Sequence, residues 1–356
     1  MIFYRGADIS SADELEKKGA CFFDGGQQED LFKILKRKGV NLIRLRIWND
    51  PYDEDGSPYG GGTNDYGVTE RLARRAKEQG MELLLDFHYS DFWADPGRQL
   101  KPKAWRGLSP AGLEAEVYKY TYDTVSRLIK EGLRPAIVQI GNEITNGLLW
   151  DAGKLPDYEN MARLLHNGIR AVREADNSIK IMLQLDFGGN NELYRNWFDK
   201  ALEHQLDFDI IGLSYYPYWH RTLDDLSSNM NDISARYDKD TLVVETAYGF
   251  TLKTVFGSKM VFNKSVLKDY RPYPITPEGQ RDFLMELKKR IRAVPNERGR
   301  GFVYWEPAWI PRSTWAAKAG MRYIGYKGKE GSNWGNQALF DFSGNALPAW
   351  EAFKEE

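Results

Sequence analysis

Eight apolar runs of strand length recur along the chain, and segments with helical periodicity separate them. In the segment after the fourth run, for example, Met161, Leu164 and Leu165 follow the i, i+3, i+4 spacing of an amphipathic helix. Strict alternation without a break in composition favours one (β/α)8 barrel, an α/β TIM barrel that spans residues 1–356 as a single domain. A doubly wound sheet is the alternative, which the count of eight does not favour. The predicted strands are Ile2–Asp8, Asn41–Trp48, Met81–Tyr89, Ala136–Glu143, Ile179–Asp186, Asp209–Tyr216, Thr241–Tyr248 and Gly301–Trp309.

The lengths of the connections indicate which end of this barrel carries the chemistry. Long segments follow the second, third, seventh and eighth runs, at Asn49–Asp65, Ser90–Leu108, Gly249–Ile275 and Ile310–Leu347. The connections at the opposite end are short, since Gln79–Met81 suffices for one of them. Because TIM-barrel enzymes place their active sites at the carboxyl ends of the strands, the long βα loops identify that face as the working face.

Composition excludes several classes of protein. The formal net charge is −2, so the chain has no surplus of basic residues for nucleic-acid binding. Cys21 is the only cysteine, which rules out an intramolecular disulfide and a cysteine metal cluster. No apolar run approaches the length of a membrane span. We therefore expect no nucleic-acid partner and no membrane partner, and we expect a monomer.

Two of the predicted strands end in a glutamate. Gly141-Asn142-Glu143 closes the fourth run, and Glu245 lies near the end of the seventh. Two carboxylates can hydrolyse a glycosidic bond, one by protonating the leaving oxygen and the other by attacking the anomeric carbon or activating water. Either glutamate alone is more readily explained as a cap or an ion-pair residue. Two on one rim favour catalysis, because buried glutamate is rare unless it is paired.

Other polar and aromatic residues close neighbouring strands. Arg44 and Arg46 share one face of the second strand, where an arginine can keep a carboxylate ionised or form an ion pair inside the barrel. A tyrosine at the end of the sixth strand can donate to a nucleophilic carboxylate, and a tryptophan in a cleft can stack on a sugar ring. The candidate substrate-binding side chains are Arg46, Asp86, His88, Asp91, Trp93, Asn142, Asp186, Tyr215, Tyr216 and Trp305. Trp48, Trp219 and Trp309 complete a tryptophan group for which core packing is a less natural explanation.

No metal or other cofactor is predicted. Asp86 and His88 have metal-ligating side chains, but the chain has only four histidines and no His-x-His pair. Sugar hydroxyl binding is therefore the preferred role for His88.

With these residues identified, the chain resembles glycoside hydrolase family 53, the arabinogalactan endo-β-1,4-galactanases. The resemblance runs from end to end and is specific because the segments occur in order. They are Tyr4–Ser10, Arg44–Trp48, Asp86–Asp91, Trp93–Pro96, Ile140–Ile144, Gly147–Trp150, Ser214–Pro217, Val243–Thr246, Tyr304–Ile310 and Asn336–Asp341.

The resemblance implies that Glu143 is the general acid/base and that Glu245 is the nucleophile. It also implies endo cleavage of β-1,4-linked galactan with retention of configuration, so the expected partner is a polysaccharide or oligosaccharide. Some bacterial members bind calcium through an acidic, histidine-containing segment after the seventh strand. Here that segment, Gly249–Phe256, is neither acidic nor histidine-containing, and calcium is not expected.

Two alternatives stay open. A related clan member acting on mannan or β-glucan fits the same strand-end residues, and a non-catalytic carbohydrate-binding barrel would require the loss of one glutamate. The first residues contain no basic and apolar leader, so a signal peptide is either absent in nature or already removed. We expect a secreted or cell-surface protein whose signal peptide is absent from this chain, with a cytoplasmic location as the alternative.

Overall fold

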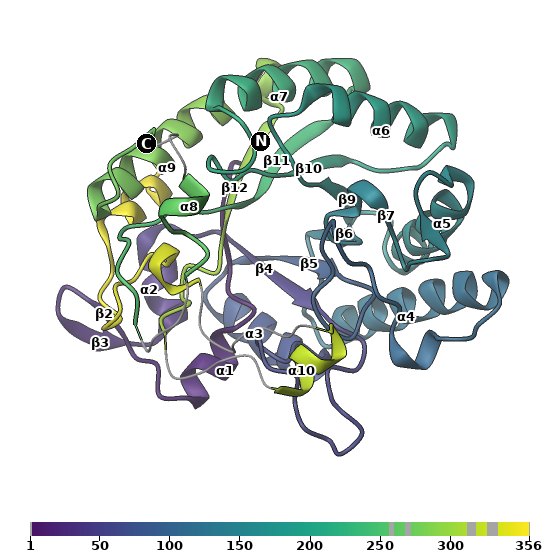
Figure 1. Cartoon of the computed structure of the whole chain (residues 1–356), viewed down its shortest axis with the longest axis horizontal. Coiled ribbons are helices and arrows are strands. Elements are labelled where there is room, and N and C mark those ends of the chain that lie inside the picture. The colour runs from purple at the N-terminus through teal and green to yellow at the C-terminus, as the bar shows by residue number, and fades with distance from the viewer. Residues whose placement is uncertain (1, 256–259, 268–271, 312–317, 326–333, 356) are drawn as a thin grey trace.

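The fold is a closed barrel of eight parallel strands with helices on its outside, seen in a computed structural model that describes residues 2–255, 260–267, 272–311, 318–325 and 334–355 (Figure 1). Around the barrel the order is β1, β12, β11, β10, β9, β6, β5 and β4. The predicted α/β TIM barrel is therefore confirmed. The barrel strands are Tyr4–Asp8 (β1), Leu42–Ile47 (β4), Glu82–Phe87 (β5), Ile137–Ile140 (β6), Lys180–Leu185 (β9), Ile210–Ser214 (β10), Asp240–Thr246 (β11) and Gly299–Trp305 (β12).

Helices connect successive strands and cover the barrel. Their starts follow local chemistry, since Ser109 accepts a hydrogen bond from the Gly112 N–H in the first turn of α4, with Pro110 at the first helical position. The described helices are Ala12–Lys17 (α1), Leu31–Lys38 (α2), Tyr66–Glu78 (α3), Pro110–Lys130 (α4), Tyr158–Ala175 (α5), Asn191–Glu203 (α6), Leu223–Tyr237 (α7), Lys264–Leu267 (α8), Pro277–Arg292 (α9) and Lys318–Tyr323 (α10). A 3-10 helix, Pro348–Phe353, follows near the C-terminal end. Two small hairpins, Phe22–Asp24 with Gln27–Glu29 (β2, β3) and Gly147–Leu148 with Gly153–Lys154 (β7, β8), lie outside the barrel.

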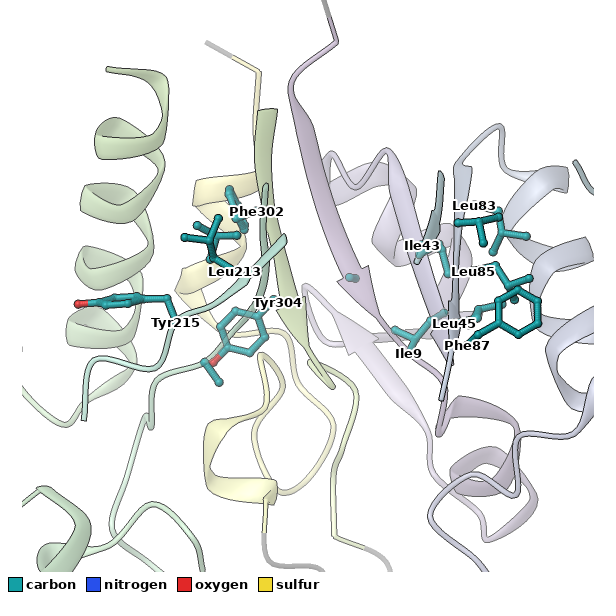
Figure 2. Close-up of a cluster of buried hydrophobic side chains, with 14 of the residues drawn as sticks. Ile9, Ile43, Leu45, Leu83, Leu85, Phe87, Leu213, Tyr215, Phe302 and Tyr304 are labelled. Atoms are coloured by element: carbon teal, nitrogen blue, oxygen red, sulfur yellow. The ribbon is translucent and has the colours of Figure 1, made fainter. Parts of the chain in front are cut away.

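Alternation along each strand sorts side chains between two environments. Outward residues such as Ile43, Leu45 and Leu85 pack between the barrel and its helices in the large core (Figure 2). Inward residues such as Leu42 and Leu84 form a second cluster that fills one end of the barrel. The full second cluster is Leu42, Leu84, Ile137, Met182, Ile210, Leu242, Val244 and Val303.

The next inward positions toward the carboxyl ends of the strands are polar. Each of these positions lies two residues after a member of the second cluster. They are Arg44 on β4, Asp86 on β5, Gln139 on β6 and Gln184 on β9, and all four are buried. The barrel interior is therefore apolar at one end and densely hydrogen-bonded at the other. In the part of the chain that the structure describes, no helix is both long and apolar enough to span a bilayer.

Candidate active site

The two predicted catalytic glutamates lie at the carboxyl ends of β6 and β11. Glu245 belongs to β11 and is 6% exposed, whereas Glu143 lies three residues beyond β6 and is half-buried. Glu143 has a left-handed backbone with φ of 46°, in a region that non-glycine residues seldom occupy. The predicted strand Ala136–Glu143 is thus too long, because this backbone turns the chain away from the sheet and begins the short 3-10 helix Ile144–Asn146.

Three donors converge on the Glu245 carboxylate. The Arg44 guanidinium lies 2.8 Å from Oε1 through Nη1, and the Gln184 amide donates to the same oxygen at 3.2 Å. The Tyr216 hydroxyl donates to Oε2 at 3.1 Å. A buried carboxylate requires such compensation, because an unpaired charge out of water is costly. The prediction that a tyrosine after the sixth strand donates to this carboxylate holds for Tyr216.

The environment of Glu143 is different. Burial, the nearby negative charge of Glu245 and that of Asp186 raise the pKa of the Glu143 carboxyl well above its ordinary value, and a hydrogen bond with Ser214 offsets this only in part. Burial also raises the pKa of Asp186, whose Oδ1 accepts a hydrogen bond from Thr145. A carboxyl group that keeps its proton beside an ion-paired carboxylate is the arrangement by which glycosidases divide the roles of acid and nucleophile.

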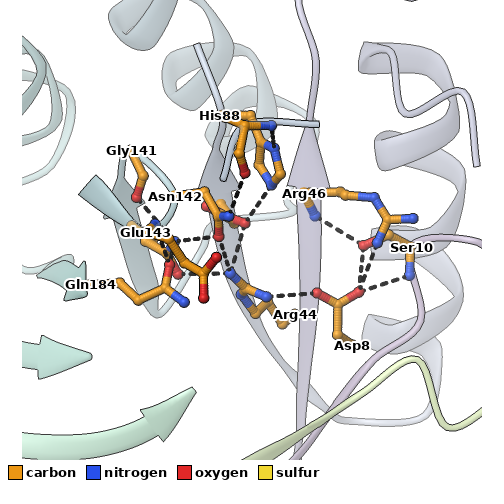
Figure 3. A network of polar contacts seen from close by, with 12 residues as sticks. Asp8, Ser10, Arg44, Arg46, His88, Gly141, Asn142, Glu143 and Gln184 are labelled. Atoms are coloured by element: carbon orange, nitrogen blue, oxygen red, sulfur yellow. Dashed lines mark hydrogen bonds and ion pairs between the residues drawn. The ribbon is translucent and has the colours of Figure 1, made fainter. Parts of the chain in front are cut away.

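Arg44 connects Glu245 to the strands on its other side, and Figure 3 shows the part of this network that joins Arg44 to Asp8 and Asn142. Its Nη1 lies 3.0 Å from Asp8 Oδ2, and its Nη2 lies 2.8 Å from both Asp86 Oδ2 and Asn142 Oδ1. One cation therefore contacts three buried carboxylates at the ends of β1, β5 and β11. From the sequence, Arg44 could either keep a catalytic carboxylate ionised or form an ion pair inside the barrel. The structure shows both, because Arg44 contacts Glu245 and also pairs with Asp8 and Asp86.

His88 and Asn142 are held in defined orientations at the same rim. The Ala94 N–H donates to His88 Nδ1 at 3.1 Å, so the ring proton is on Nε2, which lies 3.1 Å from Asp86 Oδ2. Asn142 donates from Nδ2 to the Ala94 carbonyl at 2.8 Å. Since Nδ2 carries two hydrogens, the second is available to a sugar hydroxyl.

Trp93 and Trp305 form an aromatic surface above Arg46. Both indoles are half-buried, and their ring centroids are 5.8 Å apart. Arg46 lies 4.2 Å from the Trp93 ring centroid and pairs through Nη1 with Glu306 Oε1 at 2.6 Å. Arg46 is only 1% exposed, so its predicted direct contact with substrate is corrected to a position beneath the indoles.

Three other predicted substrate contacts are corrected for the same reason. Asp86 has no exposed surface and contacts Arg44 and His88. Asp91 has no exposed surface and accepts hydrogen bonds from the backbone N–H groups of Asp50 and Lys103, so it joins two loops. Tyr215 is fully buried and donates to the Arg221 carbonyl, pointing away from the barrel axis (Figure 2). The tyrosine lies on the outward face of the strand end by the alternation that turns Tyr216 inward.

The other three tryptophans of the predicted group differ in their exposure to solvent. Trp219 is 43% exposed, whereas Trp48 and Trp309 are buried, so packing explains the last two. Among the described residues no three histidine, cysteine, aspartate or glutamate side chains form a metal-binding group. Phe256, the last residue of the segment discussed for calcium, lies outside the described residues.

Sequence reasoning missed Gln139 and Gln184, which are fully buried at the centre of the site. Gln184 accepts from the Glu143 backbone N–H at 2.9 Å while it donates to Glu245. A signal was available, because each glutamine interrupts an apolar strand on its inward face. The other missed residues are Asp8, Ser10, Ser11 and Ser214, all buried among these groups.

A closed parallel barrel with a glutamate at the end of β6 and another at the end of β11 defines the class of barrel glycoside hydrolases. The model of glycosyl hydrolase family 53 matches residues 4–353. The chain belongs to glycosyl hydrolase family 53.

Similar proteins of known name or structure support this family membership. The chain is 38% identical over 373 residues to the endo-β-1,4-galactanase of Bacillus subtilis, covering 99% of this chain and 85% of the relative. The structure resembles the family 53 catalytic domain of Ignisphaera aggregans, with a TM-score of 0.92 and 41% identity over 99% of this chain and 95% of the other. A fungal β-1,4-galactanase structure matches with a TM-score of 0.83 and 32% identity over the full length of both chains.

Proposed function

We propose that this protein is an endo-acting glycoside hydrolase that cleaves β-1,4-galactosidic bonds in galactan and type I arabinogalactan with retention of configuration. The observation that carries the proposal is the unequal glutamate pair. Glu143 has a raised pKa, and Glu245 has three hydrogen-bond and ion-pair donors. Family membership and the galactanase names of the relatives supply the substrate.

The mechanism has two steps. In the first, the Glu245 carboxylate attacks the anomeric carbon while Glu143 gives its proton to the departing glycosidic oxygen, which leaves a covalent galactosyl-enzyme. In the second, Glu143, now a carboxylate, takes a proton from water, and the water oxygen displaces Glu245. Retention requires the two carboxyl groups to be about 5–5.5 Å apart, so that the nucleophile reaches the sugar directly.

The rim residues supply substrate contacts in this proposal. The Trp93 and Trp305 indoles offer a flat apolar surface to the C–H face of a galactosyl ring. Asn142, His88 and Asp186 offer polar groups for hydroxyls, and Asp86 orients His88. We further propose that residues 1–356 act as one catalytic unit without a cofactor, as a monomer. We place the enzyme outside the cell, because its substrate is a polymer.

The decisive experiment measures reducing-sugar release from β-1,4-galactan, mannan, xylan and β-glucan, with Glu245→Gln as the inactive control. Galactan should be the preferred substrate, and proton NMR should detect the β-anomer of the product before mutarotation. Preference for mannan or β-glucan would favour the related β-glycanase. No hydrolysis, together with retained galactan binding, would favour a carbohydrate-binding barrel.

A further inference from the structure

A chain of hydrogen bonds joins the two glutamates through the side chains of β6 and β9. Arg44 Nη2 donates to Gln139 Oε1 at 3.2 Å, and Gln139 Nε2 donates to Gln184 Oε1 at 2.6 Å. Gln184 Nε2 then donates to Glu245 Oε1 at 3.2 Å, and Arg44 Nη1 contacts the same oxygen at 2.8 Å. The four side chains therefore close a ring of contacts in which Arg44 is the cation and Glu245 is the anion.

The direction of each amide in this ring is fixed by its neighbours. A guanidinium can only donate, so Gln139 must present its oxygen to Arg44 and its nitrogen to Gln184. The Glu143 backbone N–H is a second donor aimed at Gln184, at 2.9 Å, and it requires the same oxygen. The Gln184 nitrogen is thereby turned toward Glu245 Oε1 and Ser214 Oγ, the latter at 2.9 Å.

Packing leaves Gln184 little freedom to adopt another position. The side chain has no exposed surface, and Gly212 is its partner in the register of β9 with β10. A Cβ atom at Gly212 would lie 3.1 Å from the Gln184 Cβ, a closer approach than side chains normally make. A glycine on β10 thus makes room for the glutamine on β9.

We propose that Gln184, oriented by Gln139, is the positioning residue that sets the two glutamates relative to each other. Its oxygen holds the backbone of Glu143 in the left-handed turn, and its nitrogen holds one oxygen of Glu245. β9 and β10 lie between β6 and β11 in the barrel, so one side chain bridges the gap between the glutamates. This inference rests on the roles proposed above for Glu143 and Glu245.

Three variants separate the two contacts of Gln184, which accepts a hydrogen bond from the Glu143 N–H and donates one to Glu245. Gln184→Leu removes both the acceptor and the donor. Gln184→Glu, when ionised, still accepts from the Glu143 N–H but cannot donate to Glu245. Gln139→Glu touches neither catalytic glutamate, yet it removes the donor to the Gln184 oxygen. When ionised, the new carboxylate faces the Gln184 oxygen, so the Gln184 amide keeps only the Glu143 N–H as a donor to that oxygen and is held less firmly toward Glu245.

We expect each variant to lower kcat by roughly 100-fold, the scale seen when one preorganised donor is removed from an active site. KM for an activated aryl β-galactobioside should stay near the wild-type value, because the indoles and rim residues are unchanged. The matched control is Thr241→Val, which removes a buried hydrogen bond to the Arg298 carbonyl at the opposite end of β11. It should leave kcat and KM unchanged, and melting temperatures measured for all four variants report on folding.

The proposal is overturned if kcat stays near the wild-type value in Gln184→Leu and Gln184→Glu, or if KM rises while kcat is kept. If Gln184→Leu does not fold, the two isosteric variants decide, and if none folds the network is only a folding determinant and the proposal is rejected. The substrate preference of the wild-type enzyme tests the proposed function independently of these variants. Should wild type prefer another β-glycan, the galactanase assignment fails, and the variants are compared on an aryl glycoside of that sugar.

Discussion

Replacing Arg44 by methionine tests how the site keeps its carboxylates charged. The guanidinium lies 2.8–3.0 Å from carboxyl oxygens of Asp8, Asp86 and Glu245, all of which are buried. At 2.8 Å each contact has a Coulomb energy of about 6 kcal/mol for an effective dielectric constant of about 20. Most of this offsets desolvation, so removing the cation should cost about 3–5 kcal/mol of unfolding free energy, the range for breaking a buried ion pair.

This loss of unfolding free energy should lower the melting temperature by a measurable amount. Unfolding entropy is about 2.1 cal/mol/K per residue, so the melting temperature of a chain of this length should fall by about 4–7 °C. The rate should fall as well, since Glu245 loses its cation, and we expect kcat on an aryl β-galactobioside to drop by about 100-fold or more. Differential scanning calorimetry and steady-state kinetics measure the two effects on one sample.

Arg75→Met is the matched control. Arg75 also pairs with two carboxylates, Glu16 at 2.6 Å and Asp30 at 2.7 Å, but its side chain is 27% exposed. Partly exposed pairs contribute about 0–1 kcal/mol, so this variant should melt close to wild type with unchanged kcat. Equal melting temperatures and equal kcat for Arg44→Met and Arg75→Met would refute the reasoning.

Three further predictions concern the two catalytic glutamates, Tyr216 and the buried His220. Glu245→Ala should lack double-displacement turnover of every substrate, and added azide should give it at most an α-azide. Glu143→Ala should release an activated leaving group and, with azide, yield a β-configured glycosyl azide; the opposite configurations would reverse the two roles. Tyr216→Phe removes the donor to Glu245 Oε2 and should lower kcat roughly 10- to 100-fold with little change in KM, whereas an unchanged kcat would assign the hydroxyl no part in catalysis. Burial lowers the pKa of His220 to about 4, so unfolding binds a proton between that value and the ordinary one. The unfolding free energy should therefore fall by about 1.4 kcal/mol per unit as pH drops from about 6.5 to about 4. Urea titrations of His220→Gln should show a flatter dependence, and an identical slope would contradict this.

The architecture and the strand ends that carry the site follow from local sequence patterns. Eight apolar runs alternating with helical periodicity predicted the barrel, because strands buried on both faces need no polar alternation. Glu143 and Glu245 were identifiable from their position alone, since the carboxyl ends of parallel strands meet at one rim. Strand lengths were overestimated at Ala136–Glu143, because a left-handed turn at a non-glycine residue has no signal in the sequence.

Which polar residues reach the site depends on how the elements pack together. Arg46, Asp91 and Tyr215 occur in the same segments as the rim residues, but they are buried against other elements. Arg44 and Gln184 act through partners far away in sequence, 201 residues from Arg44 to Glu245 and 61 from Gln184 to Glu245. The periodicity of the sequence indicates the face of a strand on which a side chain lies. The residues that this side chain contacts depend on the closure of the barrel, which no local sequence pattern encodes.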